Sequence, residues 1–152
     1  MPHLIANHIF IPEIARLLDE GKEVMFTPTG DSMRPFIEGG KDTVVLVRKD
    51  MIRVGDICLA QMPLLPGTDI PKYVLHRVIE VRDEEVVLQG DGNLHGVEYC
   101  AKKDVYGTVT SIRTPWGKKK WLTGGWIWRT LCHPRWFWLK VYRHSILKYA
   151  YS

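Results

Sequence analysis

Hydrophobic positions near the start of the chain recur with a helical period. Ile14, Leu17 and Leu18 are three or four residues apart or adjacent, which is typical of a helix with one buried face. Pro12 suits the first turn of such a helix, and Gly21 suits a position just beyond its end. The pattern therefore predicts a short amphipathic helix of about ten residues near the N-terminus.

Beyond Glu23 the hydrophobic positions form short runs rich in β-branched residues. These runs comprise residues 23–26, 43–47, 57–62, 73–81, 85–89 and 105–112. Gly, Pro and Asp separate them, which is typical of antiparallel strands joined by turns. Residues 82–84 form a connection short enough for a hairpin, whereas the proline-rich segment 62–72 is expected to be a loop. The fold is therefore predicted to be mainly β.

Composition and charge divide the chain further. Its 152 residues, 45% of them hydrophobic, fit one compact domain with an appendage. The net charge is +4, yet Asp104 is the last acidic residue, and all six tryptophans lie between Trp116 and Trp138. The segments that we expect are an N-terminal helical segment (1–22), a β domain (23–113) and a basic, aromatic tail (114–152).

The cysteines and the termini bear on location and partners. Cys58, Cys100 and Cys132 form no CxxC pair, and the N-terminus lacks the pattern of a secretory leader. We therefore expect reduced thiols and a cytoplasmic protein. Pro134 could open a helix in the tail, where tryptophans and basic residues suit peripheral attachment to a membrane surface. Packing of the tail on the β domain and binding of a protein partner are the alternatives.

A serine lies in a constrained turn before the second strand run. Gly30 permits an unusual backbone angle, Ser32 follows two residues later, and Pro35 restrains the exit. A serine hydroxyl is a poor nucleophile unless it is held near a base, with donors facing the developing oxyanion. An ordinary loop serine would lie in the same kind of turn. The hypothesis that Ser32 is catalytic therefore depends on a nearby base.

His76 is the candidate base. In the run 73–81 it shares one face with Val74 and Val78, and a neutral imidazole on a half-buried face can accept a proton near pH 7. Arg77 points to the opposite face and stays protonated, so it cannot act as a base. A structural histidine is the alternative interpretation.

Five motifs occur in a family-like order. GDSMRPFIEGG, VGDI, VLHRVIEV, LQGDGN and DVYGTV follow one another between about residues 25 and 112, and they resemble the successive boxes of the signal peptidase I and LexA-like serine peptidases. The resemblance implies a LexA-like antiparallel β domain with serine endopeptidase activity. It makes Ser32 the nucleophile and Met33 a residue on the floor of the substrate groove.

In that superfamily the base is a lysine in one branch and a histidine in the endoplasmic-reticulum and archaeal-type signal peptidases. His76 occupies the base position, so the chain resembles the histidine branch, here without an N-terminal membrane anchor. An imidazole base predicts activity that rises near pH 6.5, the ordinary histidine value, and then reaches a plateau. The backbone N–H groups of Asp31 and Ser32 are the expected oxyanion donors.

The sequence leaves open which residue, if any, is the third catalytic member. The histidine branch usually adds an aspartate a few residues beyond the box that reads Gly90 to Asn93 here, and that position falls at about Val97. Glu98 could orient the imidazole after a shift of one residue. Asp91 could do so instead, although Asp-Gly is also a turn former, or the pair could work as a dyad.

Two functions of different classes follow. A peptidase would bind an extended peptide beside a strand edge, with small residues before the cleaved bond by resemblance. A catalytically weak peptide-binding module of the same fold is the alternative, supported by Val97 at the expected aspartate position. Nucleic acid and self-cleaving regulation are disfavoured, because about 25 residues before the serine box leave no room for a helix-turn-helix. We expect no metal and no cofactor, because metal-ligand spacing and nucleotide-binding motifs are missing.

Overall fold

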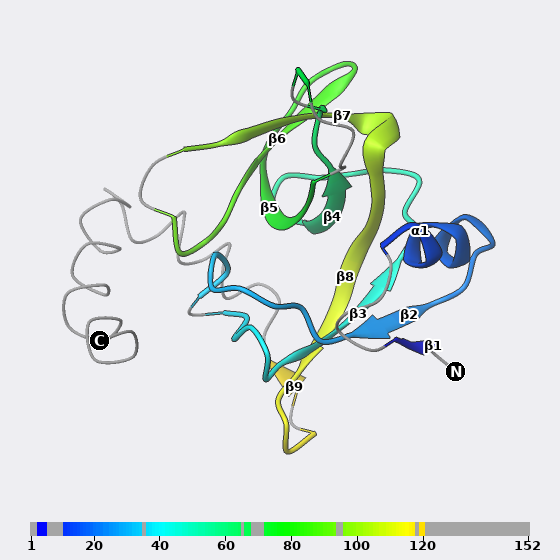
Figure 1. The fold of residues 1–152 in the computed structure, drawn as a ribbon, viewed down its shortest axis with the longest axis vertical. Coiled ribbons are helices and arrows are strands. Elements are labelled where there is room, and N and C mark those ends of the chain that lie inside the picture. The colour runs from blue at the N-terminus through cyan, green and yellow to red at the C-terminus, as the bar shows by residue number, and fades with distance from the viewer. Residues whose placement is uncertain are drawn as a thin grey trace.

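The computed structural model describes residues 3–5, 11–34, 36–64, 66–67, 72–93, 96–117 and 119–120. Within these ranges nine strands form one sheet, with one α-helix beside it (Figure 1). In chain order the elements are β1 (His3–Ile5), α1 (Ile11–Asp19), β2 (Val24–Phe26), β3 (Thr43–Val47), β4 (Ile57–Gln61), β5 (Tyr73–Val81), β6 (Glu85–Gln89), β7 (Glu98–Ala101), a 3-10 turn (Lys102–Asp104), β8 (Val105–Arg113) and β9 (Lys119–Lys120).

The mainly β architecture predicted from the sequence is confirmed. All six predicted strands and the helix are present, and β5 and β6 form the expected hairpin, closed by a bond from the Arg82 N–H to the Glu85 carbonyl (2.9 Å). Strands β1, β7 and β9 were not predicted. The N-terminal segment therefore contributes a strand as well as a helix, and β1 pairs with β2 in the one parallel contact among the described strands.

The sheet consists of two parts joined by β8. Its order is β1-β2-β3-β8-β4-β5-β6-β7, with β9 added beside β8. Figure 1 shows β8 running from the part that holds β2 and β3 to the part that holds β4 to β7. The pairing of β8 shifts register against both β3 and β4, and such irregularities bend a sheet.

The sheet has two hydrophobic cores, and β4 contributes to both. The first core contains residues of α1, β2, β3, β4 and β8 together with Met33 and Ile37. The second contains residues of β4, β5, β6 and β7, among them Val74 and Val78. Ser32 and His76 are therefore attached to different cores, and any contact between them must be made where the two cores meet.

Strand β5 has an open edge along its first half. It pairs with β4 from Tyr73 to Arg77, but its pairing with β6 begins only at Arg77. Among the described residues, none pairs with Tyr73 to His76 on the side away from β4. This half-strand therefore offers an unpaired edge next to the candidate site.

The predicted loop and tail are described only in part. The described residues of 62–72 contain no strand, as predicted. The tail begins as a turn, closed by a bond from the Gly117 N–H to the Thr114 carbonyl (2.9 Å), and continues into β9. The helix predicted after Pro134, and Cys132, lie outside the described residues. None of the helices seen in the described ranges is both long and apolar enough to cross a bilayer.

Candidate active site

Ser32 lies in a turn that the first core holds in place. The next residue, Met33, is buried in that core together with Ile37, and the Ile37 N–H donates to the Met33 carbonyl (3.0 Å). On the other side of Ser32, Gly30 has a φ of 93°, a left-handed conformation that glycine adopts without steric cost. Pro35, the predicted exit of the turn, lies outside the described residues. The backbone on both sides of Ser32 is thus constrained.

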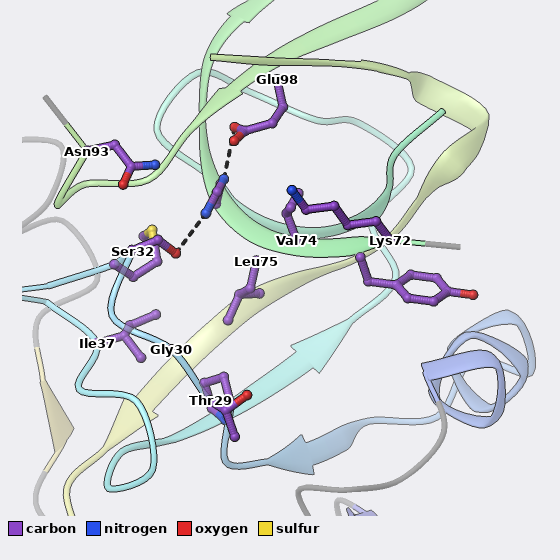
Figure 2. A pocket seen from close by; sticks show the side chains of 13 residues that line it. Thr29, Gly30, Ser32, Ile37, Lys72, Val74, Leu75, Asn93 and Glu98 are labelled. Carbon is purple, nitrogen blue, oxygen red and sulfur yellow. Dashed lines mark hydrogen bonds and ion pairs between the residues drawn. The ribbon is translucent and has the colours of Figure 1, made fainter. Parts of the chain in front are cut away.

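The His76 ring connects a hydroxyl to a carboxylate. Its Nε2 lies 2.8 Å from the Ser32 Oγ, although the two residues are 44 positions apart, and its Nδ1 lies 2.9 Å from a Glu98 carboxylate oxygen (Figure 2). Because an ionised carboxylate can only accept, Nδ1 is assigned as the donor, which leaves Nε2 to accept from the Ser32 hydroxyl. The three side chains form one continuous hydrogen-bonded chain.

Burial limits the access of water to this chain of contacts. His76 is 6% exposed and shares a face with the buried Val74 and Val78, as the alternation of β5 predicted. The Glu98 side chain is 23% exposed. Hydrogen bonds are electrostatically stronger in such a low-dielectric setting than in water, so the imidazole is held firmly between its two partners.

Strand register places Glu98 on the face of the sheet that carries His76. Glu98 pairs with Leu88 across β6 and β7, and Leu88 pairs with Val78 across β5 and β6. Directly opposite residues of antiparallel strands lie on one face, and Val78 shares its face with His76. The Glu98 carboxylate and the imidazole therefore lie on the same side of the sheet.

Gly90 allows the Ser32 turn to lie close to the end of β6. A Cβ at position 90 would collide with the Ser32 carbonyl oxygen, and that oxygen accepts a hydrogen bond from the Gly92 N–H (2.8 Å). The motif that contains Gly90 does not by itself indicate this role. A glycine directly after a buried strand is the sequence signal for such a close approach of two backbone segments.

Asp91 does not contact the imidazole, which corrects the expectation that it could orient His76. Its carboxylate instead accepts from the Arg77 Nε (2.9 and 3.0 Å) and Nη2 (2.8 Å). Arg77 and Asp91 are 1% and 0% exposed, and a guanidinium buried this deeply requires a hydrogen-bonded counter-charge. The turn reading of Asp91 agrees with the bond from the Asn93 N–H to the Gly90 carbonyl (3.0 Å).

We predict that Asp91→Asn destabilises the protein by about 3 kcal/mol, because it leaves the buried Arg77 charge without its counter-charge. Urea unfolding followed by circular dichroism measures the change. Asp83→Asn, in the exposed β5–β6 hairpin, is the matched control and should change stability by less than about 0.5 kcal/mol. Equal stability of the two variants would contradict this role of the pair.

The expected oxyanion donors are the backbone N–H groups of Asp31 and Ser32. The Asp31 carboxylate bonds to Arg34 (3.3 Å). Within the described ranges, no backbone acceptor takes either N–H. Ser32 lines the cleft described next and Asp31 does not, so the role of the Asp31 N–H stays a prediction.

A cleft of about 360 Å³ opens beside Ser32. Its walls are residues of the Ser32 turn and the open edge of β5. The described residues that line it are Pro28, Thr29, Gly30, Ser32, Met33, Ile37, Lys72, Tyr73, Val74, Leu75, His76, Asn93 and Glu98. Met33 lines the cleft as the resemblance implies, but it is mostly buried in the first core. The cleft is the size of a small ligand site and is bordered along one side by an unpaired strand edge.

The described cysteines are not competing nucleophiles. Burial raises the pKa of the Cys58 thiol to about 12 and that of Cys100 to about 11, so both are protonated at neutral pH and unreactive. In the described part of the chain, no three His, Cys, Asp or Glu side chains gather in a way that could hold a metal ion. Among the described residues that line the cleft, Ser32 is thus the one with the surroundings that a nucleophile requires.

Comparison of the sequence with protein-family models and with curated proteins gave no match. What this chain does must therefore be inferred from the contacts of its own residues. Those contacts are the hydrogen bonds from Ser32 through His76 to Glu98, three residues that line one cleft.

Proposed function

We propose that this chain is a serine endopeptidase with a LexA-like and signal peptidase-like fold. Ser32 is the nucleophile, His76 the general base and Glu98 the acid that orients the imidazole. The observation that carries the proposal is the continuous chain of hydrogen bonds from Ser32 through His76 to Glu98, of 2.8 and 2.9 Å. Both lengths fall within the about 2.6–3.2 Å expected between a nucleophile, its base and the orienting group. The mainly β sheet and the order of the motifs support the choice of fold.

The geometry supports a two-step acyl transfer. The Ser32 Oγ attacks the carbonyl carbon of a peptide bond while its proton passes to the His76 Nε2, and Glu98 stabilises the resulting imidazolium. The backbone N–H groups of Asp31 and Ser32 stabilise the oxyanion. His76 then donates the proton to the leaving amine as the C–N bond breaks. Water, deprotonated by His76, hydrolyses the acyl ester and restores the serine.

The open edge of β5 supports an extended peptide as the substrate. In an antiparallel pair, alternate residues bond to the partner strand. On β5 these are the even-numbered residues, since Lys72 and Val78 both form backbone hydrogen bonds toward the β4 side. Tyr73 and Leu75 consequently direct their N–H and C=O groups to the open edge. A peptide strand could pair with them and bring a carbonyl to Ser32.

A fluorophosphonate probe tests the proposal, because it reacts covalently with an activated serine. We expect labelling at Ser32, identified by peptide mapping, with no labelling in Ser32→Ala or His76→Ala. Ser111→Ala, a serine on β8 that does not line the cleft, is the matched control and should be labelled normally. Equal labelling of wild type and His76→Ala would count against a histidine-activated serine.

The second candidate function is a peptide-binding module that hydrolyses poorly. The sequence supports this module because Val97 stands where the histidine branch has an aspartate. The neighbouring Glu98, however, contacts the imidazole (2.9 Å). That contact favours the enzyme over the module. Peptide binding without any probe labelling would favour the module.

The partners proposed from the sequence are a peptide or protein substrate and, through the tail, a membrane surface. Most of the tail lies outside the described residues, so peripheral membrane attachment and a cytoplasmic location stand as proposals from composition. Sedimentation of the protein with anionic vesicles, against neutral vesicles as the control, would test the attachment.

A further inference from the structure

The cleft contains a basic side chain that the proposed chemistry does not use. Of the described residues that line it, Lys72 and Glu98 carry a formal charge at neutral pH. The Glu98 carboxylate is bonded to His76. Lys72 is exposed, and no described residue forms an ion pair or a side-chain hydrogen bond with its ammonium group. The ammonium is thus free to bind a negative charge that enters the cleft.

The direction of this side chain follows from the strand it precedes. The Lys72 carbonyl accepts a hydrogen bond from the Met62 N–H (2.8 Å), which fixes its backbone at the start of β5. Because side chains alternate along a strand, Lys72 lies on the same face as Val74 and His76. Figure 2 shows its side chain extending along β5 toward Val74, on the side of the cleft that also holds Glu98. A rise of about 3.3 Å per residue places the Lys72 backbone about 13 Å from that of His76.

We propose that Lys72 is a specificity-determining residue that binds the carboxylate of an acidic side chain in the peptide substrate. The proposal rests on the proposed function, since it assumes that a peptide pairs with the open edge of β5. Such a peptide advances at the same rise as β5, and the Lys72 side chain extends toward Val74 (Figure 2), so the residue beside its ammonium group lies about two to four residues from the one beside His76. An ammonium group acts as a point charge, so it favours Asp or Glu at that position and disfavours Lys or Arg.

Binding to the Ser32→Ala protein measures this preference without turnover. The probes are Ala-rich peptides with an N-terminal dansyl group and a C-terminal amide, so that a free terminal carboxylate cannot substitute for a side chain. Each carries a single Glu or a single Gln, moved one position at a time along the peptide. Fluorescence anisotropy then gives Kd for every Glu and Gln pair.

We expect Glu to bind about two- to fivefold more tightly than Gln at one position, the range of an exposed ion pair. The difference should disappear in Lys72→Ala, reverse in Lys72→Glu in favour of a lysine-containing peptide, and shrink at high salt because exposed charges are screened. Lys103→Ala removes an exposed lysine of the 3-10 turn, outside the cleft, and should leave the preference intact.

The inference is overturned if no peptide binds, if Glu and Gln bind equally at every position, or if the preference survives in Lys72→Ala. Loss of the preference in Lys103→Ala as well would also overturn it. Cleavage of the neutral peptides by the wild-type protein is measured separately. Hydrolysis without a charge preference overturns this inference alone, whereas charge-dependent binding without hydrolysis supports it and contradicts the proposed peptidase.

Discussion

If the proposed peptidase is correct, we expect His76→Ala to lower kcat/KM for peptide hydrolysis by about four to six orders of magnitude and Ser32→Ala to have a similar effect, because nucleophile and base act as one unit. The Ser32 hydroxyl has its hydrogen bond to the His76 Nε2 (2.8 Å), and no other described side chain is bonded to it. The neighbouring Arg77 cannot accept the proton, since its guanidinium stays protonated and is bonded to Asp91. Product formation measured by chromatography at neutral pH gives the rates.

The double variant provides the sharper test of this prediction. If Ser32 and His76 act together, Ser32→Ala/His76→Ala is no slower than either single variant. His76 is buried, so thermal unfolding of each variant is needed to show that the fold is intact. His76→Gln, which removes less volume, should be as inactive as His76→Ala. A variant that retains more than about a hundredth of the wild-type rate would contradict general-base catalysis by His76, which typically contributes about 10²- to 10⁴-fold.

The strands could be predicted from the sequence where their own side chains carried the pattern. Strand β5 alternates along its length, and β3 is a continuous β-branched run between turns, so both were recognised within a residue or two. Strand β7 has only four residues and an exposed Tyr99. Its conformation depends on pairing with β6, a non-local contact that leaves little trace in its own sequence. This matters because β7 carries Glu98.

The choice between the two candidate acids depends on contacts that spacing along the chain does not show. Asp91 is held by Arg77. Glu98 reaches the imidazole because it pairs with Leu88, which pairs with Val78 on the face that carries His76. Both outcomes follow from cross-strand register, which spacing along the chain does not encode. The order of the motifs indicates which segments form the site, and the pairing of the strands determines which side chains meet in it.

The meeting of the two cores accounts for the rest of the site. Ser32 is positioned by Met33 in the first core, and His76 by its neighbours Val74 and Val78 in the second. The Arg77–Asp91 pair secures the junction, since the Asp91 N–H also contacts the Met33 sulfur (3.4 Å). The buried Arg77–Asp91 ion pair therefore helps to hold the Ser32 turn in position. In the proposed mechanism it takes no part in proton transfer.

We expect Glu98→Gln to lower kcat/KM by about 10³- to 10⁴-fold, because an amide can present its N–H₂ group to the imidazole and favour the wrong tautomer. In that tautomer Nε2 carries the proton and cannot accept one from Ser32. The Glu98 carboxylate also stabilises the imidazolium in the transition state, and glutamine lacks its charge. Initial rates of peptide hydrolysis at neutral pH measure the change.

Partial rescue by a shorter acid separates an orienting acid from a merely structural residue. Glu98→Asp keeps the charge on a shorter side chain, so it should recover part of the rate. Glu84→Gln, in the exposed β5–β6 hairpin, makes the same chemical change away from the cleft and should not alter the rate. If Glu98→Gln kept more than about a tenth of the activity, Ser32 and His76 would work as a dyad, because loss of a true triad acid costs far more than this.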